Sequence, residues 1–322
     1  MTRGSCMKTI YLDQLHWIEI SKAIHGRPVR PGTAEALEHM RRRAIGGDML
    51  FPLSLAHYFE TLKQAAPDRR QRLSTVMREL SGGNTLANPT TIVKHEIRCA
   101  LISKLGLNVP SPPLKLLGRG MEHALGRSFN IRLEWPHPEQ VPDDVRQKVE
   151  TDVFELLEST FLSGVLDIGE EPFHFPQMAL DPYKKFQGHL TQWRGSGSTM
   201  SAAELRRKIC AFTLGDIMEP MSVVLAELGV TMQRFAELGE TAWCDLLDMM
   251  PSRRADMHLH TQWAKNASLN PKLSDLNDWT YLGIAVCSCD LVVTENQMND
   301  LFQRSTEFGF KSTARLQDLL ML

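Results

Sequence analysis

The sequence has no long hydrophobic run and no apolar segment near its first residue. No stretch approaches the ~18–20 consecutive apolar residues that cross a bilayer. Residues 1–13 contain only a few apolar positions before the acid Asp13, so they lack the apolar core of a secretory signal peptide. These absences argue against a membrane-spanning class. They predict a cytoplasmic protein with no membrane partner.

Cysteine is scarce and scattered. Six cysteines occur in 322 residues, and only Cys287 and Cys289 are close in sequence. A C-x-C pair without a second cysteine cluster has poor spacing for a metal centre, and a cytosolic setting keeps thiols reduced. The sequence therefore predicts reduced core or surface thiols, with no disulfide framework.

A large net charge is also missing, since the formal charge is only −2. Overall charge therefore gives no argument for nucleic-acid binding. The distribution is uneven, however. Residues 63–132 carry twelve basic side chains against four acidic ones, a net charge of +8. Such a chain can present a basic face while remaining nearly neutral overall.

The first sixty-six residues alternate between strand-like and helix-like patterns. Short apolar, β-rich runs predict strands, and apolar residues at helical spacing predict helices. The expected order is a strand at 7–13, helices at 14–25 and 31–45, a strand at 48–54 and a helix at 55–66. This alternation is typical of a parallel α/β sheet flanked by helices.

The middle of the chain lacks this alternation. Helical patterns dominate residues 68–250, and Ser201 with Glu204 three residues later forms a capping box. The expected helices are 69–80, 91–105, 143–162, 202–228 and 232–250. A helix at 274–287, a strand at 290–294, a helix at 299–308 and a last strand or short helix at 313–322 follow. We therefore expect a discontinuous α/β domain (residues 1–67 and 251–322) with a mainly helical insertion (residues 68–250).

Acidic residues follow the predicted strands. Asp13 ends the first strand, Glu60 lies in the helix after the second, and Glu295 follows the strand at 290–294. Asp278 and Asp275 lie on the helix that leads into that strand. Ligand sites of parallel sheets form at the carboxyl ends of the strands. Several carboxylates that lack basic partners repel each other unless a hard cation such as Mg²⁺ or Mn²⁺ binds between them. A metal ion of this kind can catalyse the hydrolysis of a phosphodiester.

Three segments carry a resemblance to a known family. They read YLDQLHWIEISKA, FPLSLAHYFET and DLNDWTYLGIAVCSCDLVVTEN, in that order. Together they resemble the motifs of PIN-like domains, and more narrowly those of bacterial PIN-like proteins. The resemblance covers about residues 7–66 and 272–305, under a third of the chain.

The resemblance implies a Mg²⁺- or Mn²⁺-dependent ribonuclease fold, with RNA favoured over DNA. By position, Asp13 matches the first acid of the family, Glu60 the second and Asp278 the third. The fourth falls at Glu295, or one residue later at Asn296. These four acids are the expected catalytic and metal-binding residues. Asp275 and Asn296 are expected around them.

Each candidate also has a structural alternative. Asp13 and Glu295 could serve only as helix N-terminal residues, and Glu60 could be a solvated helix acid. Asp275 fits better as a first-turn acid that the helix macrodipole favours than as a ligand. Arg253 and Arg254 follow a predicted helix end, where phosphate contact and plain solvation are equally consistent with the sequence.

These residues are consistent with two functions. The first is an endoribonuclease, of the toxin-like or defence-effector kind, whose protein partner would be an antitoxin or a second copy of the chain. The alternative is a catalytically silent PIN-like module that binds RNA or a protein. A phosphatase with an aspartyl nucleophile fits poorly, because no second acid stands two residues after Asp13.

Overall fold

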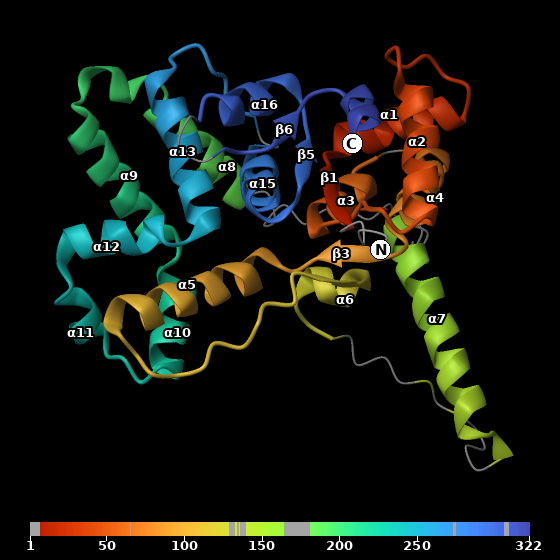
Figure 1. The fold of residues 1–322 in the computed structure, drawn as a ribbon, viewed down its shortest axis with the longest axis horizontal. Helices are drawn as coiled ribbons and strands as arrows, with labels where there is room; N and C mark the ends of the chain where they lie inside the picture. The colour runs from red at the N-terminus through yellow and green to blue at the C-terminus, as the bar shows by residue number, and fades with distance from the viewer. Residues whose placement is uncertain are drawn as a thin grey trace, which may run out of the picture. The chain divides into compact units, whose positions relative to one another are not determined.

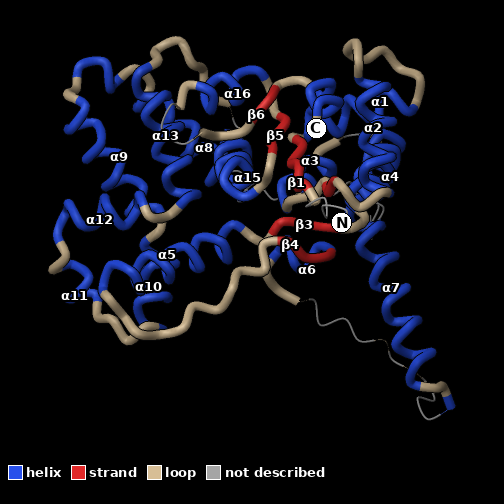
Figure 2. The backbone as a smooth tube through the Cα atoms, viewed as in Figure 1, coloured by secondary structure: helices blue, strands red, loops and turns tan. Residues whose placement is uncertain are grey.

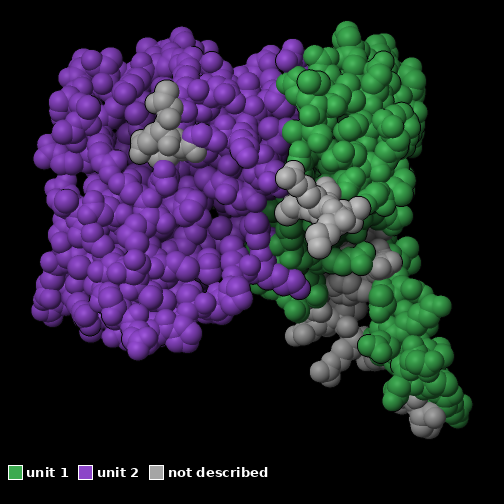
Figure 3. Space-filling view, viewed as in Figure 1, with its two compact units in different colours: residues 1–88, 117–174, 316–322 green, residues 89–116, 175–315 purple. Residues whose placement is uncertain are grey.

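The structure is a computed structural model (Figure 1). It describes residues 7–64, 66–128, 133, 135, 140–163, 181–272, 275–305 and 309–322. The chain is mixed α/β and mostly helical, and its strands are short (Figure 2). It divides into two compact units, which are coloured separately in Figure 3. Unit 1 comprises residues 1–88, 117–174 and 316–322, and unit 2 comprises residues 89–116 and 175–315.

Unit 1 contains two pairs of strands. Its elements are β1 (Lys8–Leu12), α1 (Gln14–Ile24), α2 (Thr33–Ile45), β2 (Met49–Leu50), α3 (Leu55–Leu62), α4 (Pro67–Ser81), β3 (Asn84–Leu86), β4 (Leu117–Arg119), α6 (Gly120–Leu125), α7 (Asp143–Ser163) and the 3₁₀ helix η5 (Leu316–Met321). Strands β1 and β2 pair in parallel, whereas β3 and β4 are antiparallel. Helix α1 packs on α2 and α4, and α2 packs on η5.

The core of unit 1 explains why β1 and α1 form where they do. Ile10 and Leu12 of β1 are fully buried, as are Trp17 and Ile20 of α1. An apolar strand that passes directly into a helix with an apolar face buries both elements against one core. The two positions that matter for a site, the end of β1 and the start of α1, are therefore fixed by packing.

Unit 2 has a parallel strand pair and a helical core. Its elements are α5 (Pro89–Leu105), α8 (Asp181–Trp193), η3 (Ser196–Thr199), α9 (Ala202–Asp216), α10 (Met218–Glu227), α11 (Met232–Ala236), α12 (Gly239–Asp248), α13 (Pro251–Lys265), α14 (Asp275–Asn277), a π-helical segment (Asp278–Leu282), α15 (Gly283–Ser288), β5 (Leu291–Val293), α16 (Asn296–Gln303) and β6 (Ser312–Thr313). Strands β5 and β6 are parallel. One apolar cluster joins α5, α9, α10, α11, α12 and α13.

Several predicted elements are confirmed, among them β1, α1, α5 and α7. One of the two hydrogen bonds of the predicted capping box is present, since the side chain of Ser201, the N-cap residue of α9, accepts a hydrogen bond from the Glu204 N–H. The start of the helix predicted at 274 and the end of that predicted at 308 lie outside the described residues. The boundaries of the two units differ from those of the predicted domains, so the discontinuous α/β domain stays a prediction.

Other predicted elements were wrong in extent, for identifiable reasons. The strand expected at 48–54 covers only Met49–Leu50, because Pro52 has no N–H to donate to a ladder. The helix expected at 202–228 bends by 65° between α9 and α10. Pro220 lies four residues after Asp216, where α9 ends, and a proline ring clashes with that carbonyl. The helix expected at 232–250 breaks at Gly239, which has a φ of +77°.

The lengths and hydropathies of the helices bear on membrane insertion. Among the helices that the structure describes, none is by itself both long and apolar enough to span a bilayer. The bent pair α9–α10 meets the length and hydropathy requirement only when both helices are taken together.

Candidate functional site

Asp13 lies at the junction between β1 and α1. Its backbone is extended (φ −64°, ψ 153°), and its carbonyl accepts hydrogen bonds from the N–H groups of His16 and Trp17. Asp13 therefore occupies the N-cap position, as the structural alternative expects. Its partly buried side chain, however, makes no capping hydrogen bond. The carboxylate stands at the positive end of the helix without serving as its cap.

Glu60 lies on α3 and is partly buried. Two hydrogen bonds connect its helix to the residues on either side of Asp13. The His57 ring nitrogen Nε2 lies 2.8 Å from the Leu12 carbonyl oxygen, and Gln14 Nε2 donates to Thr61 Oγ1 at 3.1 Å. The backbone around Asp13 and the backbone around Glu60 are therefore held together within unit 1.

His57 is the central residue of this connection. The Ser54 N–H donates to His57 Nδ1 at 2.8 Å, so Nε2 carries the proton and donates to Leu12. The side chain is 1% exposed, and burial lowers the pKa of His57 to about 4 although the Leu12 hydrogen bond acts in the opposite direction. The ring is therefore neutral near pH 7. It acts as a positioning residue between β1 and α3.

In unit 2, Asp275 and Glu295 lie near each other. The Asp275 carboxylate is buried and accepts a hydrogen bond from the Lys272 N–H at 2.7 Å. Burial raises the pKa of Asp275, and the negative charge of Glu295 contributes to this increase. The Glu295 carboxylate lies 3.8 Å from the Lys272 ammonium. Asp275 thus orders the turn before α14, which agrees with the structural alternative for this residue.

Glu295 repeats the arrangement of Asp13. It follows β5, has extended backbone (φ −67°, ψ 160°) and is the N-cap residue of α16. Its side chain, too, makes no capping hydrogen bond. Asn296, the other candidate for the fourth position, is exposed in the first turn of α16.

Asp278 begins the π-helical segment Asp278–Leu282 and is partly buried. Such segments are rare, and they occur frequently at functional sites because the wider turn changes the direction of the side chains. The sequence predicted an ordinary helix through this residue. No periodicity distinguishes a π segment from an α-helix over five residues.

The structure changes the interpretation of Arg253 and Arg254. The sequence placed them after a helix end, but α13 begins at Pro251 and both residues lie in its first turn. Arg253 is 8% exposed, and its guanidinium lies 3.4 Å from the Asp216 carboxylate. This residue is a buried ion-pair partner, which argues against phosphate contact and against plain solvation. Arg254 borders a pocket of about 270 Å³ together with Cys287.

The five cysteines that the structure describes are free thiols, as the sequence predicts. Burial raises the pKa of Cys287 and of Cys289 to about 12. Both are therefore protonated near neutral pH, where a thiol is a poor metal ligand and a poor nucleophile. Cys6 lies outside the described residues.

The predicted acids belong to different units. Asp13 and Glu60 are in unit 1, whereas Asp275, Asp278 and Glu295 are in unit 2. Within the part of the chain that the structure describes, no three side chains of His, Cys, Asp or Glu are close enough to hold one metal ion. The described residues therefore contain no ready-made metal centre, and the Mg²⁺ or Mn²⁺ ligand set stays a prediction.

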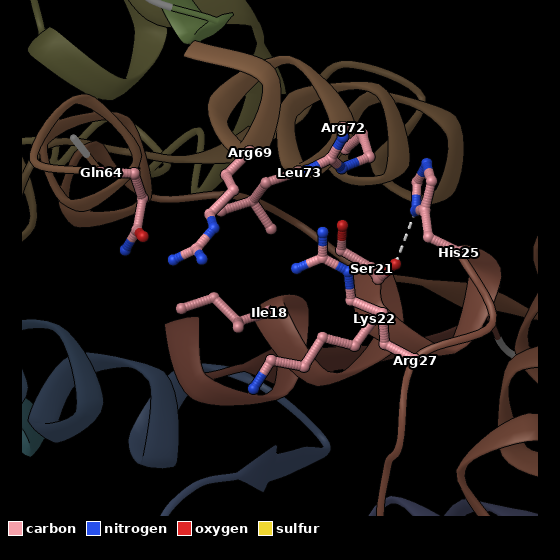
Figure 4. Close-up of a pocket in the computed structure, with 9 residues that line it drawn as sticks. All are labelled: Ile18, Ser21, Lys22, His25, Arg27, Gln64, Arg69, Arg72 and Leu73. Carbon is pink, nitrogen blue, oxygen red and sulfur yellow. Dashed lines mark hydrogen bonds between the residues drawn. The ribbon is translucent and has the colours of Figure 1, made fainter. Parts of the chain in front are cut away.

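A second candidate site lies entirely within unit 1. It is a pocket of about 410 Å³ between α1 and the start of α4, shown in Figure 4. Its lining includes Lys22, Arg27, Arg69, Arg72 and His25, and the other lining residues are uncharged. Arg69 and Arg72 come from the basic stretch that the sequence identified, but the sequence did not associate Lys22 and Arg27 with them.

No family model, curated protein or solved structure matches this chain. The PIN-like resemblance therefore depends on the three sequence segments and on the strand-end positions of their acids.

Proposed function

We propose that this protein is a Mg²⁺- or Mn²⁺-dependent endoribonuclease of the PIN type, with Asp13, Glu60, Asp278 and Glu295 as metal ligands. The divalent ion would activate water, polarise a backbone phosphate and stabilise the leaving oxygen. The set consists only of oxygen donors, which are the ligands that hard cations take. The proposed role in the cell is that of a toxin-like or defence effector.

The observation that carries the proposal is the shared position of Asp13 and Glu295. Each follows a strand of a parallel pair, each is the N-cap residue of the next helix, and neither side chain caps that helix. A carboxylate that serves as a helix cap accepts a hydrogen bond from a backbone N–H at the helix N-terminus. Side-chain capping therefore does not account for either carboxylate, which is consistent with the role proposed for them.

The residues around the acids have supporting roles in this proposal. His57 and Gln14 fix the helix that carries Glu60 against the strand end that carries Asp13. The positive charge of Lys272, beside Glu295, reduces the electrostatic repulsion between the carboxylates of unit 2. In a site of several acids such a cation reduces repulsion before the metal binds.

Cleavage of a short labelled RNA by the purified chain tests the proposal. We expect cleavage with Mg²⁺ or Mn²⁺, none with chelator, and a loss of at least ~100-fold in Asp13→Asn, because removal of one ligand impairs water activation. Asp144→Asn is the matched control, since Asp144 is an exposed first-turn acid of α7 in the same unit. Equal cleavage by the wild type and Asp13→Asn would overturn the proposed metal site.

One observation favours the alternative, a catalytically silent RNA-binding module. The described residues form no ready-made metal centre, whereas unit 1 contains a basic pocket. If the wild type and Asp13→Asn both bind RNA and neither cuts it with any divalent ion, the silent module is the correct function.

A further inference from the structure

The basic pocket of unit 1 is built mainly from one face of α1 and from the start of α4. Ile18, Ser21, Lys22 and His25 have the spacing that places residues on one side of a helix. Gln64 and Leu73 complete the wall together with the arginines (Figure 4). Helices α1 and α4 pack on each other, so the pocket is a product of the fold of this unit.

The cations of this pocket lack a carboxylate partner among the residues that the structure describes. Among the described residues, Lys22, Arg27, Arg69 and Arg72 form no ion pair with a carboxylate. Other cations of the chain do, as in the pairs Arg41–Glu79, Lys104–Asp245 and Arg253–Asp216. Four unpaired positive charges around one cavity repel each other unless an anion enters it.

Helix electrostatics does not account for the arginines. Arg69 lies in the first turn of α4, where the macrodipole disfavours cations, and Arg72 lies in the next turn. The same helix end favours an anion. The wall also contains the buried apolar side chain of Leu73, which lowers the local dielectric and strengthens attraction to a bound negative charge. Together these features indicate an anion site.

The lining also limits the kind of anion. Arginine matches phosphate oxygens with its planar fork of donors. A pocket of about 410 Å³ that opens to solvent accommodates more than one phosphate. The described residues that line it include no aromatic ring of Phe, Tyr or Trp, so they offer no platform on which a base would stack. Contacts to phosphate oxygens hold the backbone of a nucleic acid and do not distinguish one base from another.

Two lining residues of the pocket follow the acids of unit 1 closely in sequence. Lys22 of α1 follows the N-cap residue Asp13 by nine residues, about 13.5 Å along the helix axis at ~1.5 Å per residue. Gln64 follows Glu60 by four residues. A strand held in the pocket could therefore extend toward these acids.

We propose that this pocket binds the phosphodiester backbone of an RNA strand through Lys22, Arg27, Arg69 and Arg72. Binding itself is independent of the proposed nuclease activity, whereas a role in presenting the strand for cleavage rests on that function. The pocket contributes affinity without base preference, and it does not take part in the chemical step.

Fluorescence anisotropy with a labelled single-stranded RNA tests the proposal on the full chain. We expect Arg69→Gln/Arg72→Gln to weaken binding roughly tenfold or more, since charge-assisted contacts to phosphate are strong. The slope of log affinity against log salt should fall by ~1.4, because each lost phosphate contact on a single strand removes ~0.7. Thermal melting should be nearly unchanged, since surface charges contribute little to stability.

The matched control is Arg78→Gln/Arg207→Gln, which removes the same charge from two exposed arginines outside the pocket. This variant should bind RNA as the wild type does. Equal weakening in both variants would show that only net charge matters and would overturn the proposal, as would no weakening in either.

Competition with inorganic tripolyphosphate distinguishes the source of the phosphate groups. If the pocket variant loses tripolyphosphate binding but keeps wild-type RNA affinity, the ligand is a free polyphosphate and the RNA proposal fails. Cleavage assays separate this outcome from the nuclease question. If RNA binding depends on the pocket but no RNA is cleaved, only the nuclease proposal fails. If RNA is cleaved but the pocket variant binds it as tightly as the wild type does, only the pocket proposal fails.

Discussion

At the scale of single residues, His57 shows how a buried polar side chain fixes two elements. Its ring accepts from the Ser54 N–H and donates to the Leu12 carbonyl, so both nitrogens are used in the neutral form. Protonation would place a second proton on Nδ1, against the Ser54 donor, in a site without solvent. The geometry of β1 and α3 therefore requires an uncharged ring.

This requirement predicts a pH-dependent stability. The folded-state pKa of His57, about 4, is below the unfolded value of 6.5, so the unfolded chain binds more protons between these values. Stability is lost as pH falls through this window. Between about pH 7.5 and about pH 5 the loss from this residue is about 2 kcal/mol.

Urea unfolding of the wild type and of His57→Gln at both pH values measures this effect. We expect the variant to be less stable near neutral pH, because it loses one of two buried hydrogen bonds. The difference between the two proteins should shrink by about 2 kcal/mol at the lower pH. A difference that does not change with pH would mean that His57 is not held neutral.

The individual acids were predictable because the sequence places them after apolar, β-rich runs. Asp13 and Glu295 lie at the strand ends where the pattern indicates them. The hydrogen bonds of His57 and the ion pair of Arg253 were not predictable, since they join residues far apart in the chain. For Arg253 the error followed from one missed element, the helix α13.

At the scale of elements, the N-terminus of α13 shows a cap supplied by another helix. Met250, its N-cap residue, makes no side-chain capping bond. Instead the Glu96 carboxylate of α5 accepts from the Ser252 N–H at 3.1 Å and from the Ser252 hydroxyl at 2.5 Å. Burial raises the pKa of Glu96, and these hydrogen bonds oppose the increase.

Removal of this cap should destabilise the protein. We expect Glu96→Ala to lower the unfolding free energy by about 1–2 kcal/mol, the usual range for loss of an N-terminal cap. Glu96→Gln should cost less, because an amide oxygen still accepts a hydrogen bond. Denaturant midpoints provide the measurement, and Glu219→Ala, an exposed first-turn acid of α10, is the control. A Glu96→Ala midpoint equal to that of the control would contradict the capping role.

Elements with local signals were predictable, and those that depend on distant partners were not. Helices α1, α5 and α7 follow from the spacing of their own apolar residues. Strands β3 and β4 are three residues each and are defined by pairing across thirty residues of sequence. The basic pocket was hidden for the same reason, because it exists only where α1 packs on α4.

At the scale of the whole molecule, the net charge is close to zero, but positive charges are concentrated in parts of the chain. The basic stretch of the sequence is divided between the two units, and in unit 2 Arg98 pairs with Glu227 and Lys104 with Asp245. Only part of it, Arg69 and Arg72, joins the pocket of unit 1. RNA affinity should therefore depend on this pocket more than on overall charge.

The central claim is that acids from both ends of the sequence hold one divalent ion, and calorimetric titration with Mn²⁺ tests it most directly. We expect one site in the wild type, and a large loss of affinity in Asp13→Asn and in Asp278→Asn. The double variant should be hardly weaker than either single one, because ligands of a shared ion are not additive. Asp144→Asn should bind as the wild type does. Unchanged Mn²⁺ binding in Asp13→Asn, or independent and additive losses, would contradict the account.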